Sequence, residues 1–138
     1  MRIPDEARLL RGREAVIDCP LEGCRICVSA CGFSAIRPDE SGRPFSDPSK
    51  CVGCGGCAAI CPERAIRLLR LTGGGAEVTL PCDEPLPELE EVILVPPLSG
   101  GEPVPAKVTW AMPKRPKAVS ALVRASVPAS YLELPAEE

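Results

Sequence analysis

Residues 51–62 read Cys51-Val52-Gly53-Cys54-Gly55-Gly56-Cys57-Ala58-Ala59-Ile60-Cys61-Pro62, which is the spacing C-x2-C-x2-C-x3-C-P. This spacing is typical of iron–sulfur ligation. Two intervening residues form a tight turn, which aims successive sulfurs at neighbouring corners of one iron–sulfur cube. The glycines allow the backbone to curl close to the inorganic sulfides and to direct amide N–H groups at them. The fourth cysteine starts a helical turn that faces away, so we expect it to serve another cluster.

A related quartet of cysteines lies 30 residues earlier. A shift of 30 residues places Cys24, Cys27 and Cys31 on Cys54, Cys57 and Cys61. Ala-Ile-Arg follows in both halves, at 35–37 and 65–67. The earlier half departs from the later one twice, because four residues separate Cys19 from Cys24 and because Gly32 replaces the expected proline.

Because of the longer loop, Cys19 either is a ligand of the first cluster or does not reach it. Extra residues on a surface loop add little closure entropy, so we expect Cys19 to reach the same iron as a first-position ligand would. If it cannot, that cluster would have three ligands and could lose an iron.

The composition excludes several classes of function. The chain has 138 residues, no histidine and a net charge of −3. Without histidine there is no Rieske cluster, no histidine-ligated haem or zinc and no Ser-His or Cys-His catalytic pair. The net charge removes the basis for nonspecific nucleic-acid binding. No apolar run reaches the ~18 residues of a membrane span, and no secretory signal is evident, so we expect a cytoplasmic protein.

Eight of the nine cysteines lie between residues 19 and 61. In a reducing compartment such clustering indicates metal before disulfides. The alternative is zinc, since four-cysteine zinc sites are common, but zinc ribbons do not need two stacked C-x2-C steps followed by C-x3-C-P. The ninth, Cys82, matches no quartet, and we expect an ordinary half-buried thiol at a strand end.

Over roughly residues 14–71 the chain resembles the bacterial two-cluster ferredoxins. The resemblance implies two [4Fe–4S] clusters in an α+β ferredoxin-like fold with pseudo-twofold symmetry. It implies one cluster on Cys19, Cys24, Cys27 and Cys61. It implies the other on Cys51, Cys54, Cys57 and Cys31. We expect the different loops to make the two clusters inequivalent.

The coarse pattern divides the chain into a two-cluster domain, 1–71, and a Pro-rich extension, 72–138. We expect outer strands at 15–17 and 65–71, a hairpin within 36–45 and a solvated helix over 2–14. Thr72-Gly73-Gly74-Gly75 is interpreted as a flexible hinge. The extension is expected to hold strands at 76–80, 90–95 and 104–110, with Pro105 confining the last to an edge. A single amphipathic helix is expected over 117–127.

These features predict electron transfer without a catalytic site of its own. No G-x-G-x-x-G motif follows a strand, so no flavin or nicotinamide site is expected in this chain. The large extension favours a resident iron–sulfur subunit of an oxidoreductase, in a hetero-oligomer with a redox partner such as a flavoprotein subunit. The alternative is a diffusible ferredoxin that serves several enzymes.

Overall fold

The computed structural model describes residues 4–19, 25–98 and 101–132, and the fold in this part of the chain is α+β. The elements in chain order are α1 (Glu6–Arg11), β1 (Glu14–Ile17), α2 (Ile26–Ala30), β2 (Ile36–Pro38), β3 (Pro44–Ser46), α3 (Gly56–Ile60), β4 (Ile66–Thr72), β5 (Gly75–Cys82), β6 (Val92–Val95), β7 (Val104–Met112), β8 (Ala121–Val127) and the 3-10 helix η1 (Ala129–Leu132).

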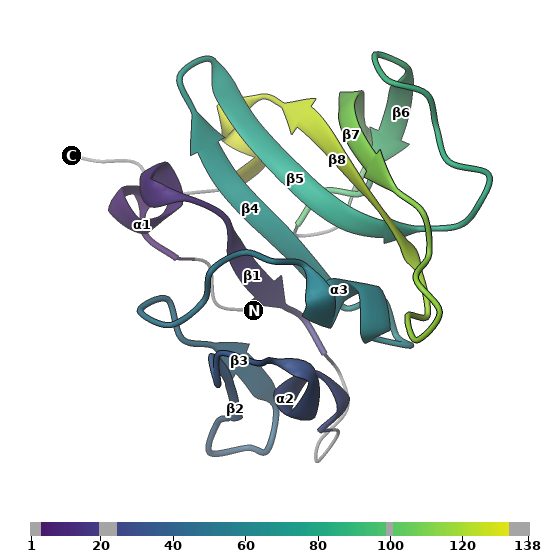
Figure 1. Cartoon of the computed structure of the whole chain (residues 1–138). Coiled ribbons are helices and arrows are strands. Elements are labelled where there is room, and N and C mark those ends of the chain that lie inside the picture. Colours follow the sequence, from purple (N-terminus) through teal and green to yellow (C-terminus); the bar gives the residue numbers. More distant parts are fainter. Residues whose placement is uncertain (1–3, 20–24, 99–100, 133–138) are drawn as a thin grey trace.

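One twisted antiparallel sheet connects both ends of the sequence (Figure 1). Its strand order in the described residues is β1-β4-β5-β8-β7-β6, and β2 and β3 form a separate hairpin. The expected boundary after residue 71 falls one residue before the end of β4, and β4 pairs with β5 across it, from Leu68–Thr79 to Thr72–Gly75. The strands of the extension therefore continue the sheet that the first 71 residues begin.

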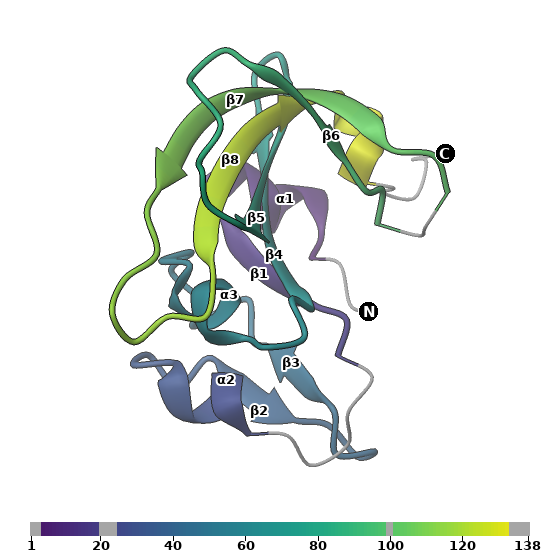
Figure 2. The same ribbon diagram turned by 90° about the vertical axis from the view of Figure 1, so that its right-hand side faces the viewer.

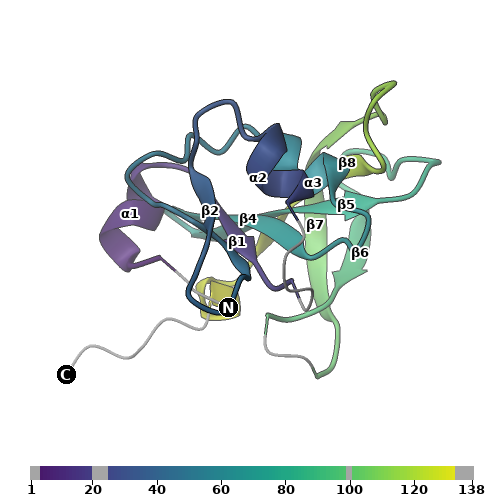
Figure 3. The same ribbon diagram turned by 90° about the horizontal axis from the view of Figure 1, so that it is seen from below.

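Two apolar cores lie on opposite faces of this sheet, because side chains alternate along each strand. On one face, Leu69 of β4 packs with Leu9 of α1 and Leu132 of η1. On the other, Leu68 of β4 packs with Leu122 of β8 and with the cysteine-bearing helices. Seen edge-on, the sheet has α3 beside its lower part (Figure 2), and from below α2 and α3 lie side by side (Figure 3). We call the second core the cysteine-side core.

Most expected strands are confirmed. The outer strands expected at 15–17 and 65–71 are β1 and β4, and the hairpin expected within 36–45 is β2–β3. The three strands expected in the extension are β5, β6 and β7. In each case a short apolar or alternating run is bounded by turn residues, which is the most dependable local signal for a strand.

The helix expected over 117–127 is wrong, because residues 121–127 form strand β8 between β5 and β7. Apolar side chains of β8 are buried on both faces of the sheet: Leu122 in the cysteine-side core, Val127 in the other. A strand buried on both faces carries a near-continuous apolar run, and such a run also satisfies a helical pattern. These residues form a strand because they pair with both β5 and β7, and the local sequence does not show that pairing.

Three smaller expectations also need correction. Pro105 does not confine β7 to an edge, because the register pairs Pro105 only with Leu94 of β6, and pairing with β8 begins at Lys107. The glycines after Thr72 form the tight turn of the β4–β5 hairpin and are no flexible hinge. Of the helix expected over 2–14, residues 2 and 3 lie outside the described residues, and from residue 4 on only Glu6–Arg11 is helical; this helix is not fully solvated, since Arg8 is buried.

No helix in the described residues is both long enough and apolar enough to cross a membrane.

Shortening Leu122 tests the contribution of the extension to the cysteine-side core. This side chain is 1% exposed, so Leu122→Ala should lower the free energy of unfolding by about 2–5 kcal/mol through lost burial and a cavity. The matched control is Val119→Ala, at a position 46% exposed, which should change it by less than about 0.5 kcal/mol. Anaerobic thermal denaturation followed by circular dichroism measures both, and equal effects would contradict this description of the core.

Candidate iron–sulfur site

The two cysteine-bearing helices repeat the same local geometry. α2 and α3 each have five residues, and each ends where a cysteine N–H donates to the carbonyl of the cysteine four residues earlier. These bonds are 3.1 Å from Cys31 to Cys27 and 3.2 Å from Cys61 to Cys57. Three residues further on, Ser34 and Arg64 both adopt a positive φ, of 54° and 52°. In these described segments the sequence repeat is thus also a repeat of backbone conformation.

One pocket brings together four cysteines from both halves of the sequence. Its lining includes Cys31, Cys51, Cys54 and Cys57. The remaining wall is apolar or glycine, with Ala15, Leu68 and Gly55 among its residues. Four thiols facing one apolar pocket are the donor set that a [4Fe–4S] cluster requires. The residues present at this site therefore fit that group.

The other four expected ligands are described only in part. Cys27 and Cys61 are buried in the cysteine-side core, and Cys19 packs against it from the loop after β1. Cys24 lies outside the described residues. The structure thus places three members of this set around the same core. Among the described residues, no three His, Cys, Asp or Glu side chains are grouped so as to hold a single metal ion.

Backbone amides point at two of the sulfurs in the pocket. Ala15 N–H donates to Cys51 Sγ at 3.5 Å, and Ala35 N–H donates to Cys31 Sγ at 3.4 Å. Ala15 belongs to β1, far from Cys51 in sequence. Hydrogen bonds to ligand sulfurs stabilise negative charge there and are one of the levers that set a cluster's potential.

Burial favours the protonated thiols of the pocket over their thiolates. It raises the pKa of Cys57 to about 12, with a further contribution from the neighbouring Cys51 and Cys54. Burial also raises the pKa of Cys51, against the lowering effect of the hydrogen bond from Ala15. Because iron binds the thiolate, ligation must displace these protons, and binding of the metal is coupled to proton release.

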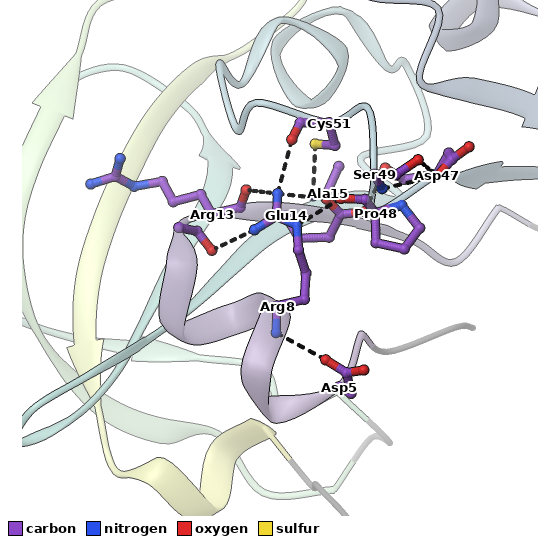
Figure 4. Close-up of polar contacts among 11 residues, drawn as sticks. Asp5, Arg8, Arg13, Glu14, Ala15, Asp47, Pro48, Ser49 and Cys51 are labelled. Carbon is purple, nitrogen blue, oxygen red and sulfur yellow. Dashed lines mark hydrogen bonds and ion pairs between the residues drawn. The ribbon is translucent and has the colours of Figure 1, made fainter.

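A buried arginine fixes the loop that carries Cys51 (Figure 4). The Arg8 guanidinium donates to the carbonyls of Pro48 (2.9 Å), Gly12 (3.1 Å), Arg13 (2.8 Å) and Cys51 (2.9 Å). It also pairs with Glu14 at 3.0 Å. The planar guanidinium, with five N–H donors in a fixed arrangement, can serve several acceptors at once. Arg8 thereby connects α1, the start of β1 and the loop before the second cysteine quartet.

The other oxygen of Glu14 extends the network to the β2–β3 hairpin, because Ser46 Oγ donates to Glu14 Oε1 at 2.9 Å. Glu14 is 0% exposed and Arg8 8%. Sequence reasoning missed both residues, since an N-terminal stretch rich in charges indicates a solvated helix. Only the long-range contacts of Arg8 with residues 48 and 51 distinguish it from Arg11, which is exposed on the same helix.

Two glycines of the second quartet are required by their surroundings. Gly53 has φ +73°, and a Cβ there would lie 2.5 Å from Arg13 Cβ and 2.8 Å from the Arg13 carbonyl oxygen. Gly55 has φ +85°, and a Cβ there would lie 3.1 Å from Leu122 Cδ1. The sequence pattern alone relates these glycines only to a cluster, whereas the structure shows that they also admit the close approach of Arg13, just before β1, and of Leu122 in β8.

The fold is α+β, and the cysteines grouped at one pocket fit an iron–sulfur cluster. Residues 18–69 match the family model described as the 4Fe-4S dicluster domain. This part of the chain is similar to ferredoxin-like iron–sulfur domains, and the resemblance expected from the sequence is confirmed.

Curated proteins also match part of the chain. The IorA subunit of indolepyruvate oxidoreductase from Thermococcus kodakarensis is 46% identical over 56 residues, 40% of this chain and 9% of that protein. A subunit of an ion-translocating oxidoreductase complex from Methanosarcina acetivorans is 42% identical over 55 residues, 40% of this chain and 20% of that protein. The archaeal-type NADPH glutamate synthase of Thermotoga maritima is 46% identical over 44 residues, 31% of this chain and 9% of that protein.

The matched region thus spans a fifth or less of each of these relatives. The first two are oxidoreductase subunits by name, and the third is by name an NADPH-dependent synthase. No solved structure is significantly similar to the chain.

Replacing Arg8 by methionine tests the polar network. Arg8→Met leaves the Glu14 carboxylate buried without its cation, and loss of one partner of a buried pair destabilises by about 3–5 kcal/mol. The control Arg11→Met, on the exposed side of α1, should change the unfolding free energy by less than about 0.5 kcal/mol. Anaerobic denaturation of both variants measures the difference, and an Arg8→Met protein as stable as the control would contradict the network's structural role.

Adding a methyl group at Gly53 tests the close approach of Arg13. Gly53→Ala places a side chain in the left-handed region, at a cost of about 1–2 kcal/mol, and adds a clash with backbone atoms of Arg13 that cannot move freely. Gly73→Ala is the control, since nothing lies within 4 Å of a Cβ there. We expect Gly53→Ala to bind less iron than Gly73→Ala after identical reconstitution. Equal iron contents would refute the requirement for glycine at position 53.

Proposed function

We propose that the protein binds two [4Fe–4S] clusters and transfers electrons as the iron–sulfur subunit of a larger oxidoreductase. One cluster would be held by Cys51, Cys54, Cys57 and Cys31. The other would be held by Cys19, Cys24, Cys27 and Cys61. Each cluster, when bound, stores and releases one electron. The chain's own residues provide the thiolates, the amide donors to the sulfurs and the apolar surroundings that limit access of water.

The observation that carries this proposal is the pocket with cysteines of both halves. Cys31 follows α2, yet it lines the same pocket as Cys51, Cys54 and Cys57 of the second quartet. A site built from one consecutive quartet would use Cys61 as its fourth member. Cys61 is not among the residues that line this pocket, although it lies in the cysteine-side core with Cys27 and Cys57. This exchange of the fourth cysteine supports two ligand sets that share the two halves of the repeat, with the pseudo-twofold symmetry expected from the sequence.

Two features support a subunit with a redox partner. The matched relatives include subunits of multi-subunit oxidoreductases. The cysteine-lined pocket, in the part of the chain that the structure describes, contains no carboxylate or amine that could act as acid or base. We propose that a partner, for which a flavoprotein subunit is the leading candidate, carries out the bond chemistry. Stoichiometric co-purification with a flavin-containing chain under anaerobic conditions would support this arrangement.

The second candidate is a diffusible ferredoxin. It is favoured by the exposure of Cys54, which leaves one ligand of the pocket accessible to transient partners. Deleting the extension does not separate the two candidates, because β5 pairs with β4 and Leu122 belongs to the cysteine-side core. Sedimentation of the native complex does separate them: a shuttle sediments as the 14.6 kDa chain, whereas a resident subunit sediments with its partner.

Replacing Cys31 by serine tests the proposed exchange of ligands. The wild-type protein, isolated anaerobically, should contain about eight iron atoms and about eight sulfides per chain. Cys31→Ser should alter only the cluster of Cys51, Cys54 and Cys57, so the EPR signal that changes should be the one that Cys54→Ser also changes. Cys82→Ser is the control and should leave both signals intact.

Two results would contradict the proposal. The first is a wild-type protein that contains zinc in place of iron and sulfide. The second is a Cys31→Ser protein in which the EPR signal that changes is the one that Cys27→Ser also changes, because Cys31 would then belong to the cluster of Cys27.

A further inference from the structure

The face of the sheet that carries the cysteine-side core is only half covered. α3 packs against β4, β5 and β8, and it lies beside the lower part of the sheet in Figure 2. α1 and η1 belong to the core on the opposite face. Further along the same strands, away from α3, the register places polar and charged side chains on the half that no helix of the described residues covers.

The residues of this uncovered half follow from the strand pairing. Leu68 and Leu122 face α3 in the cysteine-side core, so residues an even number of positions away on the same strands share their face. That rule places Arg70 and Arg124 on the uncovered half, and pairing of Arg70 with Glu77 adds β5. Arg124 pairs with Trp110 of β7. We call these four residues, together with Arg13 and Lys107, the open sheet face.

Among the described residues, the open sheet face holds four cationic side chains (Arg13, Arg70, Lys107 and Arg124) against one carboxylate of its own, Glu77, and Glu90 at its border lies 3.9 Å from Lys107 Nζ. Glu77 Oε1 accepts from Arg13 Nε at 2.7 Å and lies 3.2 Å from Arg124 Nε. Arg70 pairs with Glu77 in register, and its Nε is buried without a hydrogen-bond partner. Two guanidinium groups, those of Arg13 and Arg124, thus share one carboxylate. The whole chain has a net charge of −3, so this surface opposes the general charge of the protein.

Both burial and the neighbouring charges act on Arg124. Burial lowers the pKa of Arg124 most, the charge of Arg13 lowers it further, and Glu77 raises it. The guanidinium also lies over the Trp110 ring, 4.2 Å from its centroid. Such crowding of like charges disfavours the isolated protein, and added carboxylates would relieve it. Arginine and tryptophan are also the residues most enriched at the energetic centres of protein interfaces.

Exposed apolar side chains border the same surface on β6. Val92 pairs with Lys107 and Leu94 with Pro105, so both share the face of Lys107. Val92 is 66% exposed and Leu94 68% exposed. A cationic area beside exposed apolar residues has the composition of a protein-binding surface, where an apolar centre supplies affinity and charges supply orientation.

The opposite border of this surface touches the cysteine pocket. Arg13 contacts Gly53, which separates two of the cysteines that line the pocket. In Figure 4 the Arg13 side chain extends away from Cys51. Val52, in the same loop, and Cys54 are exposed. A protein that covers the open sheet face would therefore lie beside the accessible side of the proposed cluster of Cys51, Cys54 and Cys57.

We propose that the open sheet face is the docking surface for a redox protein that presents carboxylates around an apolar patch. The proposal rests on the proposed function, because it places the electron-transfer partner beside one cluster. The surplus positive charge selects an acidic partner, and Val92 and Leu94 meet its apolar patch. Arg13 and Lys107 contribute to docking, and neither residue is a ligand of a cluster.

Binding of an acidic flavodoxin, used as a probe protein, tests the proposal. Surface plasmon resonance measures association at low and high salt, so the result does not depend on electron transfer. Arg13→Gln/Lys107→Gln should lower the association rate constant at low salt at least tenfold, since steering by opposite charge contributes about 10- to 1,000-fold. It should also flatten the dependence on salt. A basic cytochrome c should not bind the wild-type protein in this way.

The matched control is Arg115→Gln/Lys117→Gln, which removes two exposed cations from the loop between β7 and β8. It should change the rate constant less than twofold. A second test, Val92→Ser/Leu94→Ser, should raise the dissociation rate several-fold while leaving the salt dependence unchanged. The ultraviolet-visible spectrum and thermal midpoint of each variant must match those of the wild type, and the β6 variant replaces the first pair if Arg13→Gln disturbs the fold.

Three results would overturn the proposal. One is an unchanged rate constant for both open-face variants. Another is a loss of binding in the Arg115→Gln/Lys117→Gln control equal to that in Arg13→Gln/Lys107→Gln. The third is concentration-dependent dimerisation of the wild type that Val92→Ser/Leu94→Ser abolishes, because the face would then be occupied by a second copy. Iron and sulfide analysis of the same samples tests the proposed function separately.

Discussion

The structure depends on bringing sulfurs from distant parts of the chain to one apolar pocket and holding the loop that carries one of them. Cys31 and Cys51 meet there although they lie 20 positions apart, and neither helix supplies the pocket alone. The loop at Cys51 has no regular secondary structure to hold it. The Cys51 carbonyl accepts a hydrogen bond from Arg8, and the Cys51 sulfur accepts one from the N–H of Ala15. A segment before the matched domain, which begins at residue 18, therefore shapes the site.

The extension after residue 71 has a structural part in the same site. The carbonyl of Ala59, in α3, accepts from the N–H groups of Val119 and Ser120 at 2.8 and 3.0 Å. This carbonyl lies in the last turn of the helix, where carbonyls lack helical partners. The loop between β7 and β8 thus caps the helix that carries Cys57. The extension therefore contributes to the fold around the cysteine-bearing helices.

Much of the fold and most of the candidate site could be predicted from the sequence. The cysteine spacing carries its own geometric meaning, and the paired helices, the β2–β3 hairpin and the strands at β4 to β7 have clear local signals. Strand β8 was not predictable in this way, because its burial on both faces gives the pattern of an amphipathic helix. Arg8 and Glu14 were missed for a related reason: a buried ion pair looks like a solvated one until its distant partners are known.

The central claim is that two iron–sulfur clusters share one small fold, each with a ligand from the opposite half. The most direct measurement is the EPR spectrum of the fully reduced protein, compared with that of the half-reduced protein. Two neighbouring paramagnetic clusters should add splitting from spin–spin interaction to the fully reduced spectrum. A single, unsplit signal at every stage of reduction, or no signal at all, would contradict the account.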